Sequence, residues 1–386
     1  MSLRKPCIVG AGLTPFGRHE GASTLSLMSQ AANAALDDAG LERADIDGLI
    51  TGYSTTHPHL MLSTLFAEHF GLQPDYAHGV QVGGATGLAM VDLARRLVAG
   101  GSVRRVLVVA GENRLTGQTR DQSIQTLAQV GDPHHEVPNG ASVPAYYALL
   151  ANRYLYETGC TERDLAELSV LMRGHAINYP GAHLTKPITA DDVMASKPIA
   201  TPLKQLDCCP ISDGAAAVVV TRDDSLPAGI PAVRISGGGQ AHTHQHVSMA
   251  PEPVAIGATR AADSALREAG RRITEMELLG IYDSFTVTLA ELLEAIGVSR
   301  RGEAAGDARN GRFALDGSLP LNPHGGLLSY GHAGVAGGMA HLVDAVRQLT
   351  GRSPSQAPAG PGLALVHADG GVLSSHVSLI LEGTHD

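Results

Sequence analysis

The chain has 386 residues, of which 44% are hydrophobic, and a formal net charge of −10. A chain of this length can bury a large core without disulfides, and its four cysteines (Cys7, Cys160, Cys208 and Cys209) form no CxxC pair. The lack of a Lys/Arg-rich run argues against a nucleic-acid partner. With no signal-peptide core and no apolar run of membrane-spanning length, we expect a cytoplasmic protein without a membrane segment.

An internal repeat begins near residue 35. The segment ALDDAGLERADIDGLITGY, residues 35–53, aligns without a gap with ALREAGRRITEMELLGIY, residues 265–282. Each copy predicts a helix, a glycine stop, an acidic helical turn and an apolar strand. A second pair, VDLARRLV from Val91 and VDAVRQLT from Val343, again predicts a helix followed by an apolar strand. Alternating helices and strands indicate an α/β fold.

The repeat predicts two α/β halves, residues 1–225 and 231–386, that are joined by a short linker. The first half holds additional polar, helix-patterned sequence over residues 113–205. We interpret this insertion as a cap or loop region laid over the first half. Continuous apolar strands such as RRVLVVAGE, from Arg104, are typical of sheets that helices cover on both faces.

Four sequence strings carry a resemblance to a known family. They are VGGATGLAM from Val82, CCPISDGAAAVVV from Cys208, YDSFTVT from Tyr282 and NPHGGLLSYGHAGVAGG from Asn322. In this order they resemble thiolases, specifically the sterol-carrier-protein-type branch. The resemblance implies a five-layered fold of two duplicated α/β halves, usually a homodimer, that acts on acyl-CoA thioesters. It implies no metal and no resident cofactor, because CoA arrives as part of the substrate.

The first candidate site is Gly84. In the family, a cysteine at this position begins a helix and is acylated, and a helix N-terminus favours a thiolate. Here the Cys-Ala-Thr-Gly pattern falls on Gly84-Ala85-Thr86-Gly87, so the nucleophile is absent and acyl transfer lacks its first step. We expect Gly84 to bind substrate; otherwise it is only a tightly packed turn.

The second candidate site is YDSFTVT. Thiolases carry Asn or His where Tyr282 stands, and the sterol-carrier branch carries an acid–base cysteine where Ser284 stands. Tyr282 could act as a phenol acid or base, or it could merely cap a loop. We expect Asp283 and Ser284 to help bind the substrate.

The third candidate site is HGGLLSYGHAGVAGG. His332 matches the family histidine that donates to the thioester oxygen as it becomes an enolate, a role that survives loss of the nucleophile. Tyr330 supplies a second phenol nearby. We also expect His324, Gly325 and Gly326 to contact substrate, although the histidines could instead be structural.

The fourth candidate site is HADGG. His367 stands where many thiolases place their second cysteine and where the sterol-carrier branch tends to have histidine. We predict an acid–base role for His367, with a hydrogen-bonded loop histidine as the alternative. Gly370 is expected to contact substrate.

These candidates favour a retro-aldol reaction beside an acyl-CoA carbonyl, in which a tyrosine is the base and His332 stabilises the enolate. Cysteine-free steroid side-chain aldolases of this fold are similar in carrying both tyrosines, and they work with a small zinc-ribbon and OB-fold partner. The alternatives are an acetyl-CoA acetyltransferase of the thiolase type and a non-catalytic acyl-CoA-binding subunit. The aldolase interpretation requires that no cysteine lies in the pocket beside His332.

Overall fold

The computed structural model describes residues 5–384 and has one nine-stranded mixed sheet with the strand order β3-β2-β4-β7-β1-β8-β11-β10-β9. The strands of the first half are β1 (Pro6–Leu13), β2 (Gly48–Gly52), β3 (Tyr76–Val80), β4 (Arg105–Asn113) and β7 (Asp213–Arg222). Those of the second half are β8 (Val233–His242), β9 (Leu278–Ile281), β10 (Leu363–Gly370) and β11 (Ser375–Gly383). Within the sheet, as described over residues 5–384, the strands of the two halves pair through β1 and β8, with Cys7 opposite Arg234 and Ile8 opposite Val233.

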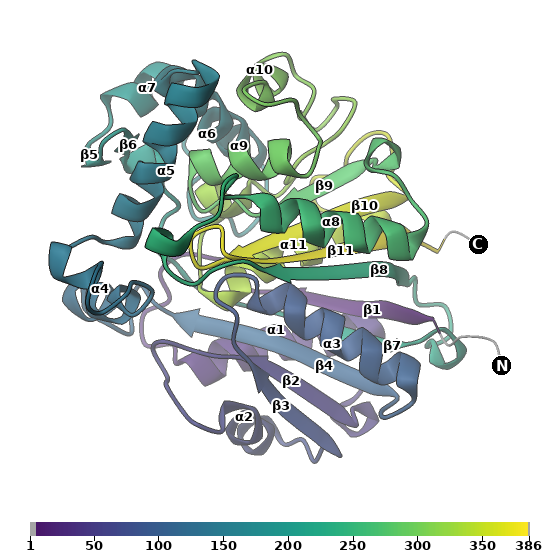
Figure 1. Cartoon of the computed structure of the whole chain (residues 1–386). Helices are drawn as coiled ribbons and strands as arrows, with labels where there is room; N and C mark the ends of the chain where they lie inside the picture. Colours follow the sequence, from purple (N-terminus) through teal and green to yellow (C-terminus); the bar gives the residue numbers. More distant parts are fainter. Residues whose placement is uncertain (1–4, 385–386) are drawn as a thin grey trace.

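The helices and the two halves of the sheet form five layers: an outer helix, the strands of the first half, the central helices, the strands of the second half and another outer helix (Figure 1). α1 (Thr24–Ala39) covers β1, β4 and β7 on one outer face, and α8 (Ile256–Ala269) covers β8 and β11 on the other. Between them, α3 (Thr86–Gly100) and α11 (Val335–Leu349) contact strands of both halves. The predicted α/β fold with five layers is therefore confirmed.

The internal repeat corresponds to equivalent elements. α1 and α8 each end at a left-handed glycine, Gly40 with φ 61° and Gly270 with φ 65°. A short 3₁₀ turn and an apolar strand follow each of them, β2 in one half and β9 in the other. These are the elements that the two aligned segments predict.

Main-chain contact sets the distance between each outer helix and its strand. A Cβ atom added at Gly10 of β1 would lie 2.1 Å from the carbonyl oxygen of Ala35 in α1. In the second half, one added at Gly237 of β8 would lie 2.2 Å from the carbonyl oxygen of Ala265 in α8. Only glycine permits so close an approach.

The insertion between β4 and β7 forms the cap. It contains α4 (Arg120–Ala128), α5 (Val143–Thr158), α6 (Glu162–Ala176), α7 (Ala190–Ala195), β5 (Pro198–Ala200) and β6 (Leu203–Lys204). We expected it to lie over the first half; α5 and α6 pack instead against α9 (Thr286–Ala295) of the second half, while the Gly181 carbonyl accepts from the Phe16 amide of the first half at 2.8 Å. α6 also contacts α10 (Ala304–Arg309) and residues 326–330. The buried stripe of Leu165, Leu168 and Met172 on α6 predicts that another element covers this face, but it does not indicate which element.

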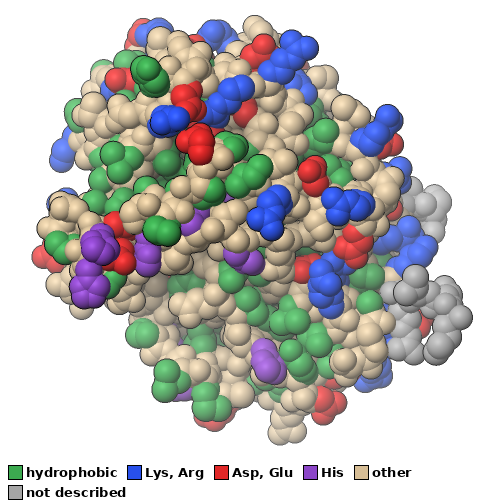
Figure 2. All heavy atoms as spheres, viewed as in Figure 1, with side chains coloured by type: hydrophobic (Ala, Val, Ile, Leu, Met, Phe, Trp, Pro, Cys, Tyr) green, Lys and Arg blue, Asp and Glu red, His purple; other side chains and the backbone are tan. Residues whose placement is uncertain are grey.

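Figure 2 shows apolar side chains along the boundary between the cap and the body, and histidines gathered over the α4 segment. α2 (Leu62–Phe70) lies against β2 and β3 at the end of the sheet. Within residues 5–384, no helix is both long enough and apolar enough to cross a bilayer.

Candidate active site

A cavity of about 750 Å³ lies where the cap meets the two halves. Gly84, Tyr282, Ser284 and His332 lie in its wall, together with the charged side chains of Glu112 and Arg114. The rest of the wall is mostly apolar and is supplied largely by the cap: Leu127, Val130, Val143, Leu184, Ile188, Ile199, Leu206, Ile211 and Phe285. The cavity therefore combines polar groups from the body with a mostly apolar cap wall, to which the cap also adds Tyr147, Arg173, Lys186 and Gln205.

The turn before α3 forms part of this wall. Thr86 holds the turn, because its Oγ1 accepts from the Val82 amide at 2.9 Å and donates to the Gly83 carbonyl at 2.6 Å. Gly83 has φ 61°, and a Cβ there would lie 2.8 Å from the Gly371 amide nitrogen. The glycine loops of the two halves are thus pressed together at the start of α3.

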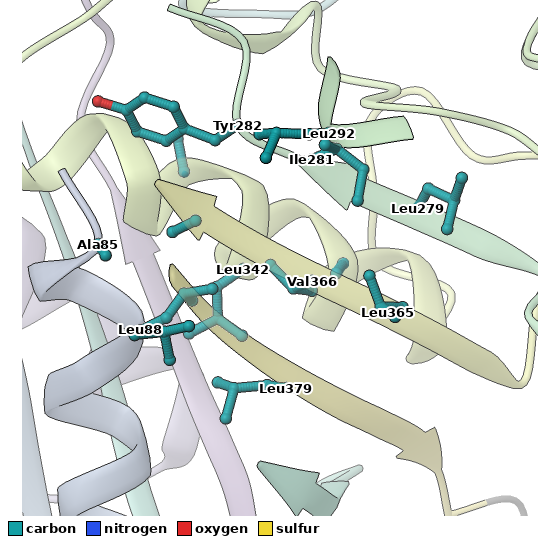
Figure 3. Close-up of a cluster of buried hydrophobic side chains, with 14 of the residues drawn as sticks. Ala85, Leu88, Leu279, Ile281, Tyr282, Leu292, Leu342, Leu365, Val366 and Leu379 are labelled. Atoms are coloured by element: carbon teal, nitrogen blue, oxygen red, sulfur yellow. The ribbon is translucent and has the colours of Figure 1, made fainter. Parts of the chain in front are cut away.

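The phenol of Tyr282 occupies the space beside Gly84 where a side chain would begin. A Cβ on Gly84 would lie 2.3 Å from Tyr282 Oη and 2.4 Å from the Asp369 carbonyl oxygen. Both distances are far below ordinary van der Waals contact. Figure 3 shows the Tyr282 ring leaving the end of β9 at the edge of the apolar cluster, on the same side as Ala85 before α3. A cysteine at position 84 and this tyrosine conformation therefore exclude each other.

Tyr282 and His332 form a hydrogen-bonded pair, with Oη 2.8 Å from Nε2. Burial, reinforced by the nearby Arg114 cation, lowers the pKa of His332 to about 3. Burial also raises the pKa of Tyr282 well above its usual value. Both groups are consequently neutral at physiological pH. One hydrogen therefore lies between them, donated either by the phenol to Nε2 or by Nε2 to the phenol oxygen.

The position of His332 depends on Asp283. The Asp283 carboxylate accepts hydrogen bonds from the Leu327 amide at 2.7 Å and the Leu328 amide at 3.3 Å. These amides lie in a short π-helical segment, Gly326–Tyr330, that precedes His332. The His332 amide then donates to the Pro210 carbonyl at 3.1 Å. Asp283 thus positions the segment and does not line the cavity.

The structure places Tyr330 and His324 behind the cavity wall. The Tyr330 hydroxyl donates to the Thr14 carbonyl at 3.1 Å, and burial raises the pKa of this phenol. His324 is buried with Nδ1 3.6 Å from the Asp344 carboxylate. The glycines 325 and 326 have positive φ values of 98° and 60°, and they form the turn that leads into the π-helical segment.

His367 also lies outside the cavity wall. It is fully buried in β10, with Nδ1 2.7 Å from Ser378 Oγ and Nε2 3.2 Å from His376 Nδ1. Gly370, at the end of β10, packs against the turn before α3, because a Cβ there would lie 2.2 Å from the Val82 carbonyl oxygen. Of the predicted site residues, the cavity wall therefore contains Gly84, Tyr282, Ser284 and His332.

One aromatic residue, Tyr147, and one acidic residue, Asp369, lie at the site but were not predicted. Tyr147 of α5 lines the cavity and its hydroxyl donates to Asp369 at 2.9 Å. Burial raises the pKa of Asp369 to about 8. The sequence offers no local signal for this contact, which joins the cap to β10.

Glu112 and Arg114 were also missed. Glu112 is the penultimate residue of β4, and its Oε2 accepts from Thr55 Oγ1 at 2.5 Å. A charged pair directly at the end of a buried apolar strand is a signal that could have been used, because such strand ends often carry functional groups.

Two cysteines reach the cavity, contrary to the requirement of the sequence interpretation. Cys208 and Cys209 both line the wall that contains His332. Their positions follow from the chain segment before β7, where the Cys209 amide donates to the Ser284 carbonyl at 3.0 Å. Burial raises the pKa of Cys208 to about 12 and that of Cys209 further. Both thiols are therefore protonated at rest, and either would need a base to act as a nucleophile.

The comparisons with known proteins agree with this architecture. Residues 7–224 match the family model described as "Thiolase, N-terminal domain", and residues 239–383 match "Thiolase C-terminal domain-like". The chain belongs to the thiolase superfamily. The structure titled "Ltp2-ChsH2(DUF35) aldolase" superposes with a TM-score of 0.85 at 30% identity, covering 99% of this chain and 98% of that chain.

Two curated relatives of this thiolase-superfamily chain have different activities. It is 34% identical to the 17-hydroxy-3-oxo-4-pregnene-20-carboxyl-CoA lyase of Mycobacterium tuberculosis, over 96% of this chain and 98% of the relative. It is 30% identical to an acetyl-CoA acetyltransferase of Methanothermobacter thermautotrophicus, over 96% and 97%. The chain is therefore an enzyme of this superfamily. The relatives alone do not distinguish a lyase from an acetyltransferase, so the choice between these reactions depends on the chemistry of the site.

Proposed function

We propose that the enzyme makes or breaks a carbon–carbon bond beside an acyl-CoA carbonyl by aldol chemistry, without an acyl-enzyme. The observation that carries this proposal is the Tyr282–His332 pair, whose phenol fills the space over Gly84. A phenol and an imidazole can move protons but cannot readily form the thioester intermediate of a thiolase.

The cleavage step follows from the 2.8 Å contact between Tyr282 Oη and His332 Nε2. With the histidine hydrogen on Nδ1, the phenol takes the proton of a substrate β-hydroxyl while its own proton passes to Nε2. The β-carbon becomes a carbonyl, and the electron pair of the Cα–Cβ bond forms the thioester enolate. The proton then returns through Tyr282 to Cα, which releases the shortened acyl-CoA. Because both groups start neutral, the proton transfer and the bond cleavage must occur together.

The apolar cap wall supports a bulky hydrophobic acyl group as the substrate. Its lining of leucine, isoleucine and valine offers few hydrogen-bonding groups, so selectivity there rests on shape and apolar contact. The named substrate of the mycobacterial lyase, a steroid thioester with a hydroxyl on the carbon next to Cα, has this chemistry. We propose it as the probe substrate.

Acyl transfer by Cys209 is the second candidate function, because this thiol lines the same cavity as His332. It would need a base to remove the thiol proton, and burial opposes ionisation. Intact-protein mass spectrometry after incubation with acetyl-CoA distinguishes the two. An acetyl adduct that is lost in Cys209→Ala would support acyl transfer and would contradict the aldol proposal.

We also propose that the enzyme forms a homodimer and works with a small partner that has a zinc ribbon and an OB fold. The similarity to the Ltp2-ChsH2(DUF35) aldolase supports the partner. Multi-angle light scattering of the enzyme alone and mixed with a DUF35 protein from the same organism tests both. A monomeric mass, or no added mass in the mixture, would contradict the respective proposal.

The reaction itself is tested by a single-turnover assay with enzyme in excess over the steroid thioester. Retro-aldol cleavage of this probe releases propionyl-CoA, which mass spectrometry quantifies. We expect Tyr282→Phe to lower the rate by about 10²- to 10⁴-fold. Tyr330→Phe is the matched control, and its hydroxyl faces the Thr14 carbonyl instead of the cavity wall, so we expect a much smaller loss. Unchanged cleavage in Tyr282→Phe would refute the proposal.

A further inference from the structure

Arg114 is a buried cation in the wall of the active-site cavity. It follows β4 directly, lines the cavity with Tyr282 and His332, and is only 9% exposed. Burying a guanidinium is costly unless it is paired and hydrogen-bonded. Its environment should therefore contain hydrogen-bond acceptors.

The surroundings of Arg114 leave this cation incompletely satisfied. Its Nε has no hydrogen-bond partner within residues 5–384. The nearest carboxylate oxygen, Glu112 Oε2, lies 3.9 Å from Nε and already accepts from Thr55 Oγ1. Glu112 is fixed there, because its other oxygen lies beneath the backbone at Gly334, where an added Cβ would be 2.4 Å away. Glu112 therefore offsets the charge of Arg114 but accepts no hydrogen bond from the guanidinium.

The other buried arginine of the cavity wall shows the contrast. Arg173 donates from Nε to Ser329 Oγ at 3.0 Å and from Nη1 to the Lys186 carbonyl at 2.9 Å. The Arg173 guanidinium therefore donates its hydrogen bonds within the protein, to the segment before His332 and to the cap. The hydrogens of Arg114 remain available to a ligand in the cavity.

The proposed reaction creates a negative charge that needs such a donor. Retro-aldol cleavage places that charge on the thioester oxygen, and preorganised donors aimed at this oxygen accelerate such reactions. His332 was expected to be one of them, but its Nε2 is engaged with Tyr282. The Arg114 charge also disfavours protonation of His332, which contributes to the low pKa of this histidine. When His332 takes the Tyr282 proton during the reaction, an enolate oxygen beside Arg114 would offset the repulsion between the two cations.

We propose that Arg114 is a catalytic residue that donates to the thioester oxygen as the enolate forms. This inference rests on the proposed aldol function and assigns the electrophilic role to a residue outside the thiolase-like motifs. Charge-assisted hydrogen bonds are about twice as strong as neutral ones, and exclusion of water strengthens them further. The hydrogen bond from Arg114 would thus strengthen as negative charge develops on the oxygen, which is the condition for lowering a barrier.

Deuterium exchange tests this role separately from bond cleavage. Propionyl-CoA, the thioester product from the steroid probe, is incubated with enzyme in D₂O, and deuterium entering at Cα is followed by mass spectrometry. We expect Arg114→Met to slow exchange by about 10²- to 10³-fold, with a change in the Kd for propionyl-CoA of less than about tenfold. Arg114→Lys keeps the charge without the planar fork and should retain an intermediate rate.

The outcomes separate the two proposals. Exchange and steroid cleavage at wild-type rates in Arg114→Met would overturn the role of Arg114 and leave the aldol function standing. The same holds if Arg114→Met only weakens binding while its exchange rate at saturation is unchanged. If the wild-type enzyme exchanges deuterium but does not cleave the steroid thioester, the aldol function fails. Should Arg114→Met not fold, the rate of Arg114→Lys decides, and a wild-type rate would count against the proposal.

Discussion

The overlap between Gly84 and the Tyr282 phenol can be measured by a double-mutant cycle. In Gly84→Ala the new methyl group would lie 2.3 Å from Tyr282 Oη, 2.7 Å from Tyr282 Cζ and 2.4 Å from the Asp369 carbonyl oxygen. Overpacking of this kind costs about 1–3 kcal/mol in unfolding free energy. The carbonyl part of this cost is fixed by the backbone, while the phenol part depends on the tyrosine.

Removing the ring should recover the phenol part of the cost. We expect Gly84→Ala to be less destabilising by at least about 1 kcal/mol in a Tyr282→Ala background than in the wild type, well beyond the additivity error of about 0.5 kcal/mol. Urea-induced unfolding of the four proteins, followed by circular dichroism, gives the coupling free energy. Tyr282→Phe is the matched control and should recover less, because the Cζ overlap remains.

Strict additivity would refute this reasoning, since it would mean that the phenol does not occupy the space beside position 84. The chemical counterpart is Gly84→Cys. With Tyr282 in place we expect no acyl adduct on the new cysteine, and mass spectrometry after incubation with acetyl-CoA checks this.

Three further predictions concern stability and the segment before His332. Gly237→Ala should destabilise the fold by about 3 kcal/mol, because its Cβ would lie 2.2 Å from the Ala265 carbonyl oxygen; an unchanged thermal midpoint would contradict the close packing of β8 and α8. Asp283→Ala leaves two buried amides without their acceptor, so hydrogen exchange in residues 326–330 should accelerate, and unchanged protection would argue against the anchor. The pKa of His332 falls from 6.5 to about 3 on folding, so the unfolded state alone binds a proton at pH 5. This histidine then costs about 2 kcal/mol of stability between pH 7 and pH 5. His332→Gln should flatten that slope in urea unfolding, and a slope equal to that of the wild type would refute the cause.

Local features of the fold could be predicted from the sequence because they depend on neighbouring residues. Gly40 and Gly270 end their helices by the same left-handed geometry, and the strand that follows each glycine is apolar in both copies. The contacts of the cap could not be predicted in this way. The apolar stripe of α6 requires a covering surface, but the pattern carries no information on which half supplies it.

The candidate site shows the same division. The meeting of Tyr282 and His332 could be predicted because each lies within a motif whose resemblance indicates its place in the fold. Tyr330 is only two residues from His332, yet the π-helical segment ends at Gly331 with φ 127°, and the two side chains have different partners across that turn. The prediction that Tyr330 lies near the same pocket as His332 relied on their short separation in sequence. It did not allow for the unusual backbone of Gly331 between them. Cys209 reaches the same cavity wall as Tyr282 through the hydrogen bond of its amide to the Ser284 carbonyl, a long-range contact that no local pattern encodes.

The glycine contacts of α1 and α8 have a consequence for how substrate preference can change. Since main chain rests on main chain there, neither outer helix can slide without steric overlap, and the layers that carry Tyr282 and His332 are held stiffly between them. The cap wall has no such restriction, because apolar side chains of different sizes can replace one another in it at modest cost. New acyl groups could therefore be accommodated by altering Leu184 or Ile188 while the reacting groups stay in register, which separates the evolution of selectivity from that of the chemistry.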